Sequence, residues 1–530
     1  STAFGQKSPN SVTQNNSHRQ YLTGQLIAEY KGVFGKHDIN VLGGWSAEEN
    51  LYEDLQGKRT NIVGNELPAL NLGDTDGWSN AADENEWALL SGFMRASYAF
   101  AAKYLVEVNF RADASSRFSK KNRWGVFPSA SVGWRITEEK FMQNQHIFDN
   151  LKLRASWGQL GNQNGLGLYD HIASYNINGY YPFKSELGQW AVISKLPSES
   201  RTWETVEVKN IAVDMAFLRN RLTVTGEYFI KKNKDMLVSI EIPSIIGIDV
   251  PTGNYGELKV KGWEVTVGWQ DKIKDFSYGA RFNLSDQKDK LVDYGVEYNG
   301  FVAGVNQKVQ GYSLGSIFGY RTDGYFTSEE EVKNSAAFNK AITGVGDIKY
   351  IDKDGDGKIS APNDLEYLGT TTPRYTFGLN LTAAWKGFDL GVLLQGVGKR
   401  NFYLSSEVMN PYYATWNNFS YKMHNDYWTP ENPNAAFPRY YAGANHNYQI
   451  SDHWLQNAAY VRLKNLQLGY TISPKLTKSW GIQRLRVYFS GDNLCEYSKL
   501  NDNFDPELSD INGYVYPIMR NFSFGINVTL

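Results

Sequence analysis

An alternation of apolar and polar side chains recurs along this chain and limits what it can fold into. In RLTVTGEYFIKK (221–232), Leu222, Val224, Tyr228 and Ile230 occupy even positions, and the odd positions are mainly polar. Successive side chains of a β-strand point to opposite faces, so this pattern predicts a strand with one apolar and one polar face. The apolar face then contacts either a protein core or lipid.

The same period of two recurs throughout the sequence. It is clear in YLVEVNFRAD (104–113), LKLRASW (151–157), RYTFGLNLTAAW (374–385) and FSFGINVTL (522–530). We expect roughly fourteen to sixteen such strands and little helix. One strand changes phase, because Val461 and Leu463 are odd whereas Leu466 and Leu468 are even. A β-bulge near Lys464 and Asn465 would explain the change.

The predicted connections alternate between very short and very long. Short ones lie at Lys386-Gly387, at Arg219-Asn220 and around 272–275, and long ones span roughly 51–86, 159–200, 287–372, 400–457 and 495–515. Tight periplasmic turns and long outer loops are typical of outer-membrane β-barrels, whereas a soluble sandwich has loops of similar size at both ends. We therefore predict an all-β fold, a transmembrane antiparallel β-barrel, in one domain over 1–530. A stacked soluble β-protein is the alternative.

Composition narrows the function classes. The net charge is -2 and charged residues are 21% of 530, so no nucleic-acid partner is expected. No apolar run could form a transmembrane helix, but barrel strands do not need one. Aromatic residues reach 14%, which suits membrane interfaces or sugar-stacking surfaces. Cys495 is the single cysteine, so no internal disulfide can form.

One local motif resembles a calcium-binding loop. DIKYIDKDGDGKISAPND (347–364) places acidic residues at alternate positions, and Gly357 permits a sharp turn. The predicted ligands are the carboxylates of Asp352, Asp354, Asp356 and Asp364 and the backbone carbonyl of Lys358. The twelfth position is Asn363, so the closing acid comes one residue late. A structural Ca²⁺ in loop 352–364 is the prediction, and a solvated acidic turn is the alternative.

Catalytic patterns are weak in this sequence. There is no HExxH motif and no close pairing of histidines, and we expect no enzyme. One long connection contains four aromatic residues that could either stack on a ligand or pack within the loops. These residues are Tyr412, Tyr413, Trp416 and Tyr427. The chain opens STAFGQKSPN, which lacks the basic and apolar stretches of a signal peptide. We expect a mature protein or a piece of a longer one.

Several blocks together resemble one known family. They include RADASSRFSKKNRWGVFPSASVGWRITEEKFM (111–142), GDIKYIDKDGDGKI (346–359), LGTTTPRYTFGLNLTAAWKGFDLGVLLQG (368–396), YVRLKNLQLGYTI (460–472) and FDPEL (504–508). In this order they resemble the C-terminal part of a SusC-like TonB-dependent transporter from the outer membrane of Bacteroidota-type bacteria.

The resemblance implies a barrel of about 22 strands around a globular plug. It also implies a SusD-like surface lipoprotein as a lid and energy delivered by TonB through a missing N-terminal part. Such transporters import oligosaccharides or peptides across outer-membrane lipid. The plug and the N-terminal extension are not present in this chain. A passive porin and a soluble carbohydrate-binding β-protein are the alternatives.

Overall fold

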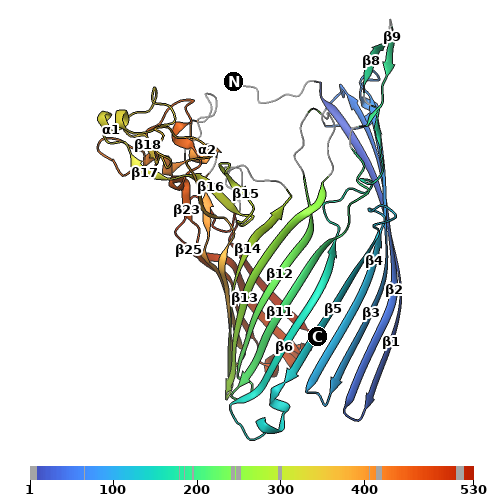
Figure 1. Ribbon diagram of the computed structural model, residues 1–530. Coiled ribbons are helices and arrows are strands. Elements are labelled where there is room, and N and C mark those ends of the chain that lie inside the picture. Colours follow the sequence, from blue (N-terminus) through green and yellow to red (C-terminus); the bar gives the residue numbers. More distant parts are fainter. Residues whose placement is uncertain are drawn as a thin grey trace. The chain divides into compact units, whose positions relative to one another are not determined.

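The structure is a computed structural model that describes most of the chain. The described residues are 9–64, 66–177, 179–183, 186–193, 196–239, 245, 252–295, 301–404, 406–412, 421–508 and 518–530. Strands dominate them (Figure 1). None of the helices in these ranges has the length and apolar composition needed to cross a bilayer.

One large sheet follows the order of the chain. In the described residues it contains fifteen strands, each hydrogen-bonded to its neighbours in this order: β1 (Ser11–Phe34), β2 (His37–Thr60), β3 (Ser79–Phe100), β4 (Tyr104–Ser115), β5 (Trp124–Arg135), β6 (Phe148–Asn162), β11 (Glu204–Phe217), β12 (Leu222–Val238), β13 (Gly253–Ile273), β14 (Phe276–Tyr294), β20 (Arg374–Trp385), β21 (Phe388–Lys399), β24 (Tyr460–Thr471), β25 (Arg484–Ser498) and β26 (Asn521–Thr529). Consecutive strands pair antiparallel, as β13 and β14 do. Antiparallel neighbours can be joined by short turns.

The strand predicted at 221–232 is confirmed as β12. Its apolar residues Leu222, Val224 and Ile230 are only partly covered, and none of them is buried. A two-layer soluble fold would place these side chains beneath a second protein layer, so this strand lacks the burial that such a fold requires.

The phase change in 459–472 is confirmed as an irregularity in the strand pairing. The register between β24 and β25 shifts between Leu463 and Asn465, and the pairing of β21 with β24 shifts at Leu393 and Leu394. Lys464 is the extra residue in the pairing with β21, so the apolar positions move from odd to even numbers while they stay on one face.

Several strands are longer than the 9–11 residues that cross a bilayer. β1 and β2 have 24 residues each, and β13 has 21. The long connections are therefore shorter than predicted: the one expected over 51–86 begins only after Thr60 and ends before Ser79. The sequence becomes polar beyond the membrane, so the alternation of apolar and polar residues no longer indicates that the strand continues.

The chain divides into two compact units, each described here by itself. The first comprises residues 1–132, 156–207 and 233–255, and the second comprises 133–155, 208–232 and 256–530. In the first unit, a small buried core consists of Phe118, Phe127, Leu166 and Trp203. Its short strands are β7 (Tyr175–Asn176), β8 (Tyr180–Phe183), β9 (Glu186–Gln189) and β10 (Val192–Ile193).

The long connections of the second unit fold into small sheets and short helices. They comprise β15 (Gly304–Gln307), β16 (Ser316–Tyr320), β17 (Thr322–Tyr325), β18 (Ile348–Tyr350), β19 (Leu365–Thr370), β22 (Asn401–Tyr403), β23 (Leu455–Asn457), α1 (Glu329–Asn334) and α2 (Ser406–Met409). A further helix, α3 (Pro474–Thr477), joins β24 to β25. Short 3-10 turns lie at Leu70–Leu72, Ile136–Glu138, Lys140–Met142, Lys422–Asn425, His446–Tyr448, Asp452–Trp454 and Lys478–Trp480.

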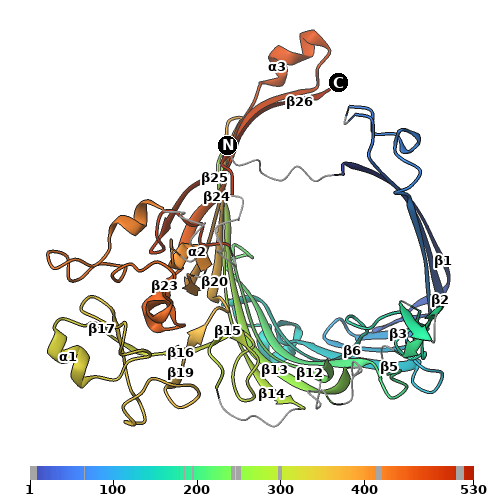
Figure 2. The same cartoon turned by 90° about the horizontal axis from the view of Figure 1, so that it is seen from above.

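A large hydrophobic core holds these connections together, and we call it the loop core. Its buried members are Tyr320, Ile348, Tyr350, Ile359, Leu365, Phe402, Leu404, Val408, Met423, Phe437, Tyr448, Trp454, Ala458, Leu500 and Phe504. Figure 2 shows the elements around it, such as β16, β19 and β23, gathered to one side of the sheet strand β20. The long connections of this unit are therefore packed structure with a core of their own.

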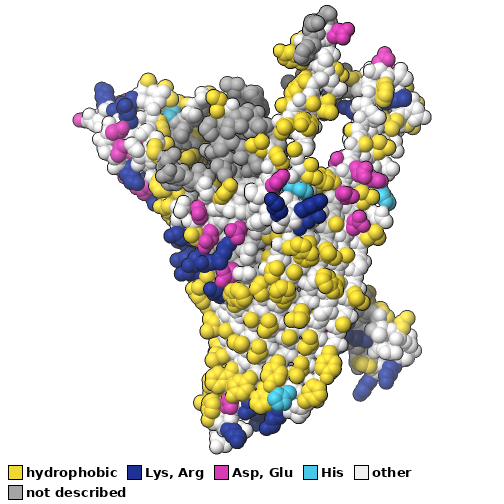
Figure 3. All heavy atoms as spheres, turned by 45° about the vertical axis from the view of Figure 1, so that its right-hand side comes forward, with side chains coloured by type: hydrophobic (Ala, Val, Ile, Leu, Met, Phe, Trp, Pro, Cys, Tyr) yellow, Lys and Arg dark blue, Asp and Glu magenta, His cyan; other side chains and the backbone are white. Residues whose placement is uncertain are grey.

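Hydrophobic side chains also gather on the outside. The face in Figure 3 carries a broad band of them over the lower part of the strands, with charged side chains above and below it. Exposed aromatic and aliphatic residues such as Tyr104, Val106, Val108 and Phe110 of β4 alternate with Glu107 and Asn109, as the sequence predicts. Such a band is larger than the scattered apolar residues of a soluble surface and matches contact with hydrocarbon.

Candidate functional site

The predicted calcium loop connects β18 to β19 and gathers three of its acidic residues. Single carboxylate oxygens of Asp352, Asp354 and Asp356 all lie within 4.8 Å of one another. Gly355 and Gly357 have φ values of +75° and +82°, a region that glycine enters without steric cost. The tight turn at these glycines brings the alternate acids together.

Backbone N–H groups inside the turn stabilise the clustered charge. Asp352 accepts hydrogen bonds from the N–H groups of Gly355 at 2.7 Å and Gly357 at 2.8 Å. Desolvation raises the pKa of the Asp352 carboxyl, but these hydrogen bonds outweigh it and leave the pKa below its usual value. The carboxylate therefore stays ionised, which is the form that binds a hard cation.

Asp364 and Lys358 both take part in hydrogen bonds of this loop. The buried Asp364 accepts hydrogen bonds from the N–H groups of Lys353 and Ser360, each at 2.7 Å, with its two oxygens. It therefore ties the two ends of the loop together, outside the group of three acids. Lys358 donates its own N–H to Asp356 at 2.8 Å. Asn363 donates its side-chain amide to Asp354 at 2.7 Å, so the twelfth position does contact the cluster.

The loop is fastened to the loop core on both sides. Ile359 is buried in that core. On the other side, the fully buried Asp347 accepts hydrogen bonds from His446 at 3.0 Å and from the side-chain amide of Asn447 at 2.9 Å. These contacts join two long connections that are far apart in the sequence.

The aromatic residues proposed for ligand stacking have partners within the chain. Tyr412 packs edge-on against Tyr440 with ring centroids 5.4 Å apart, and Tyr427 packs on the same ring at 5.3 Å. Both remain partly exposed. Loop packing therefore accounts for part of each surface, and Tyr413 and Trp416 lie outside the described residues.

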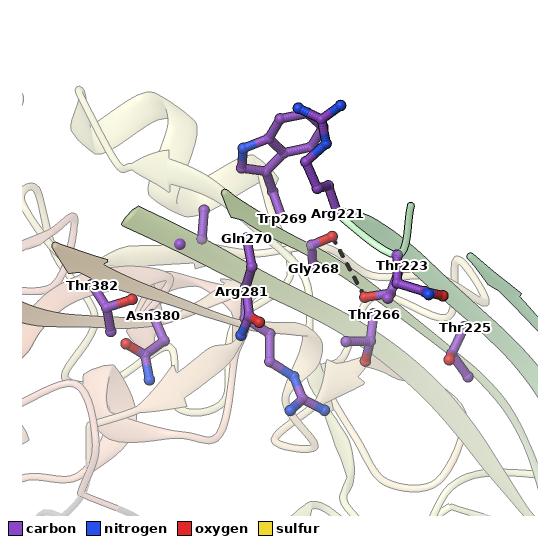
Figure 4. A pocket seen from close by; sticks show the side chains of 13 residues that line it. Arg221, Thr223, Thr225, Thr266, Gly268, Trp269, Gln270, Arg281, Asn380 and Thr382 are labelled. Carbon is purple, nitrogen blue, oxygen red and sulfur yellow. Dashed lines mark hydrogen bonds between the residues drawn. The ribbon is translucent and has the colours of Figure 1, made fainter. Parts of the chain in front are cut away.

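A polar hollow lies in the second unit on the wall formed by β12, β13, β14 and β20, and we call it the wall hollow. Its volume is about 460 Å³. It is lined by Asn220, Arg221, Thr223, Thr225, Thr266, Gly268, Trp269, Gln270, Gly279, Ala280, Arg281, Asn380 and Thr382. Register places Gly268, Arg281 and Asn380 directly beside one another on neighbouring strands. In Figure 4, Arg281 and Asn380 extend to one side of the sheet and Trp269 to the other.

Sequence reasoning did not identify this hollow. The polar alternate positions of β12, such as Thr223 and Thr225, are visible in the sequence. Their neighbours Arg281 and Asn380 come from strands separated by a long connection, and only the register aligns them.

Comparison with known proteins gives a consistent result. A family model described as TonB dependent receptor-like, beta-barrel, matches residues 1–494. TonB-dependent receptor P26 of Formosa agariphila is 30% identical over 94% of the chain and 52% of its own length. TonB-dependent receptor SusC of Bacteroides thetaiotaomicron is 28% identical over 83% of the chain and 43% of its length.

Solved structures give the same fold. The match to the structure of the RagAB peptide transporter covers 97% of the present chain and 56% of the RagAB chain. Its TM-score is 0.83 and the sequence identity is 24%. The RagAB peptide importer in its open-open state matches with a TM-score of 0.81, also at 24% identity. The chain thus spans about half the length of the relatives it matches.

Proposed function

The chain belongs to the TonB-dependent receptor-like β-barrel family of outer-membrane proteins, and we propose that it is the barrel part of an importer of oligosaccharides or peptides. The family match over 1–494 carries this proposal. Sheet strands with one apolar and one polar face support it, because hydrocarbon contacts the first face and a wet path needs the second. The family consists of receptors and transporters, so we propose no catalysis.

Two partners are part of the proposal. A SusD-like surface lipoprotein would cover the outer mouth, in line with the similarity to SusC and to the RagAB assemblies. TonB would supply energy through a part of the full-length protein that this chain lacks. A wide, water-filled lumen would leak solutes unless a plug blocks it. Displacing that plug requires energy that is supplied from outside the barrel.

Uptake by the full-length receptor tests the proposal. Cells that express it with its lipoprotein should take up a labelled oligosaccharide or peptide only while the proton gradient is intact. Collapsing the gradient with an uncoupler should stop uptake. A passive porin would continue to conduct after the gradient is lost, and this result would reject active import. A soluble binding protein would instead remain monodisperse without detergent.

We also propose that the loop of Asp352, Asp354 and Asp356 binds a structural Ca²⁺. The closeness of the three carboxylates supports it, because a divalent cation relieves their mutual repulsion. Asn363 and the carbonyl oxygen of Lys358 are further oxygen donors from the same loop. Asp364 would hold the loop ends together from outside the ligand shell.

Calorimetric titration of the full-length receptor with Ca²⁺ tests this second proposal. Binding should be lost in Asp354→Ala and kept in Glu330→Ala, which removes an exposed acid of α1 in the same connection. Equal heats from wild type and Asp354→Ala would show that the loop binds no calcium.

A further inference from the structure

An apolar groove crosses the face of the first unit that carries the exposed apolar residues of β4, and we call it the outer groove. Phe110 of β4 pairs with Met94 of β3, and Met94 pairs with Gly43 of β2, so all three lie on one face of the sheet. The groove has a volume of about 560 Å³. Its lining combines small residues, such as Ala28, Gly92 and Ala112, with larger apolar ones, such as Leu26, Trp45 and Trp124.

The outer groove faces hydrocarbon, whatever occupies the lumen. Arg111 and Asp113 alternate with Phe110 and Ala112 along β4, so they point to the opposite face, where they pair with each other at 2.8 Å. A plug inside the barrel would meet that polar face. The groove lies on the other side of the sheet, which contacts lipid.

The outer groove lies in the outer half of the bilayer. β4 has 12 residues, about the number that crosses a membrane, and it runs from the short turn after β3 to the outer connection before β5. Phe110 and Ala112 lie in its second half, and Trp124 begins β5 at the same end. A second hollow of about 640 Å³, the upper hollow, shares Trp124 and continues toward the outer surface with Leu90 and Ala114.

A basic turn lies at the outer end of these two hollows. Residues 116–123 connect β4 to β5, and they contain Arg117, Lys120, Lys121 and Arg123 but no acidic residue. Arg123 lines the upper hollow beside Trp124. Both lysines are exposed. The turn therefore places positive charge close to the point where the apolar path meets water.

Contacts within the first unit hold this turn in place. Phe118 is buried in the small core of that unit. The side chains of Ser119 and Asn122 donate hydrogen bonds to the Glu199 carbonyl at 2.8 and 2.9 Å. These contacts use apolar and uncharged groups of the turn, so the turn should keep its shape when the two lysines are replaced.

We propose that the outer groove and the basic turn bind a phosphorylated glycolipid of the outer leaflet. One acyl chain would lie in the groove against Trp45 and Phe110, where the small residues allow close dispersion contact. The lysines and arginines of the turn would pair with the phosphate, whose oxygens accept charge-assisted hydrogen bonds. The site requires only that the protein lies in an outer membrane, so it is separate from the import of cargo.

The position of the site favours a glycolipid over a phospholipid. The outer leaflet of a Gram-negative outer membrane consists mainly of phosphorylated glycolipid, whereas phospholipid forms the inner leaflet. Glu49 also lines the upper hollow, next to the basic turn. Sugar hydroxyls can donate hydrogen bonds to such a carboxylate. A sugar head group that carries phosphate thus complements both the positive turn and Glu49.

Native mass spectrometry of the full-length receptor in detergent tests the proposal. The probes are lipid A, the same lipid after chemical removal of its phosphates, and phosphatidylethanolamine. Wild type should bind lipid A about tenfold more tightly than the dephosphorylated lipid. Lys120→Gln combined with Lys121→Gln should remove most of this preference. Lys333→Gln combined with Lys340→Gln, which neutralises two exposed lysines of the second unit, should keep it.

Filling the groove tests the contact with the acyl chain. Gly92→Leu should weaken the binding of both forms of lipid A by a similar factor, because a Cβ at Gly92 already approaches the Trp45 ring at 3.3 Å. Gly226→Leu is the matched control on the apolar face of β12, where a Cβ would meet Val213 at 3.7 Å, and it should bind as wild type does. Heat-dependent migration in gel electrophoresis shows whether the barrel of each variant has folded.

Four results would overturn the proposal. Equal binding of both forms of lipid A by wild type would remove the phosphate contact. An unchanged preference in the Lys120 and Lys121 variant would place the phosphate elsewhere, and this variant decides the matter even if Gly92→Leu does not fold. Wild-type affinity in folded Gly92→Leu would show that no acyl chain lies in the groove. Tighter binding of phosphatidylethanolamine than of lipid A would assign the site to a phospholipid. None of these measurements involves uptake, so failure of active import would be seen separately.

Discussion

Arg462 of β24 donates a hydrogen bond to Asp505 at 2.7 Å, although the two residues belong to different elements of the second unit. The guanidinium is almost completely buried, and it also contacts Glu496 and, at 2.9 Å, Glu507. Asp505 and Glu507 belong to the FDPEL segment, whose Leu508 carbonyl accepts a hydrogen bond from Arg400. Three carboxylates therefore contact one buried cation.

Replacing Arg462 should release this segment. Arg462→Met keeps most of the side-chain volume but removes the cation that pairs with Glu496 and Asp505, so we expect a loss of about 3 kcal/mol in the stability of the loop core. Protease cleavage between residues 499 and 508 should become faster. Lys464→Met is the control, because Lys464 is more exposed and pairs with Glu507 alone, so about 1 kcal/mol or less is expected. Equal cleavage of both variants would show that Arg462 does not hold the segment.

Acid should loosen the loop core through His424. Burial lowers the pKa of this imidazole below its ordinary value of 6.5, although the hydrogen bond to the Val408 carbonyl at 2.8 Å opposes the shift. The folded state thus favours neutral His424. When the pH falls below about 6.5, the unfolded state takes up a proton that the folded state does not, so stability falls.

The pH dependence of protease resistance checks this prediction. Resistance of the connections around the loop core should decrease from pH 7.5 to pH 5. His424→Gln should be less stable at pH 7.5 and should show a weaker decrease. Part of the decrease should remain, because burial also lowers the pKa of His453. An unchanged slope in the variant would assign the acid sensitivity to other groups.

Close backbone contact explains a required glycine in the loop core. Gly319 of β16 lies against the Ile450 carbonyl, which accepts a hydrogen bond from the Tyr320 N–H at 2.8 Å. A Cβ at Gly319 would overlap that carbonyl, so Gly319→Ala should cost about 1–3 kcal/mol. Gly391→Ala is the matched control, because its Cβ would meet only the Cβ of Gln467 at 4.0 Å. Thermal unfolding followed by near-ultraviolet circular dichroism should separate the two variants.

The strands were predictable from the sequence because a period of two is a local property. The bulge at Lys464 was predictable for the same reason, since one extra residue changes the parity of every later apolar position. The family was predictable because several sequence blocks occur in the family's order. The ends of the strands were not predictable, because β1 and β2 continue beyond their apolar parts.

The sites depended on contacts that are distant in the sequence. The alternate acids at Asp352, Asp354 and Asp356 were visible as a motif, but nothing in the sequence showed that both oxygens of Asp364 accept backbone N–H groups. The wall hollow requires the register of β14 against β20, and a connection of many residues separates these strands. The loop core was missed because its apolar residues lie in irregular segments without any period.

The two faces of β12 should respond oppositely to the same charge. Val224 lies on the apolar face and is partly covered, and the next residue, Thr225, lies on the polar face, where its hydroxyl donates to Asp214 at 3.2 Å. An arginine at position 224 must enter hydrocarbon or distort the bilayer, which costs about 2–4 kcal/mol near the midplane. An arginine at 225 meets water and the Asp214 carboxylate, so Thr225→Arg should cost less than about 1 kcal/mol. Folding of the full-length receptor into lipid vesicles from urea, followed by tryptophan fluorescence, measures both. A larger loss for Thr225→Arg than for Val224→Arg would mean that protein covers the apolar face and lipid contacts the polar one, and the assignment of this strand to the membrane would then be wrong.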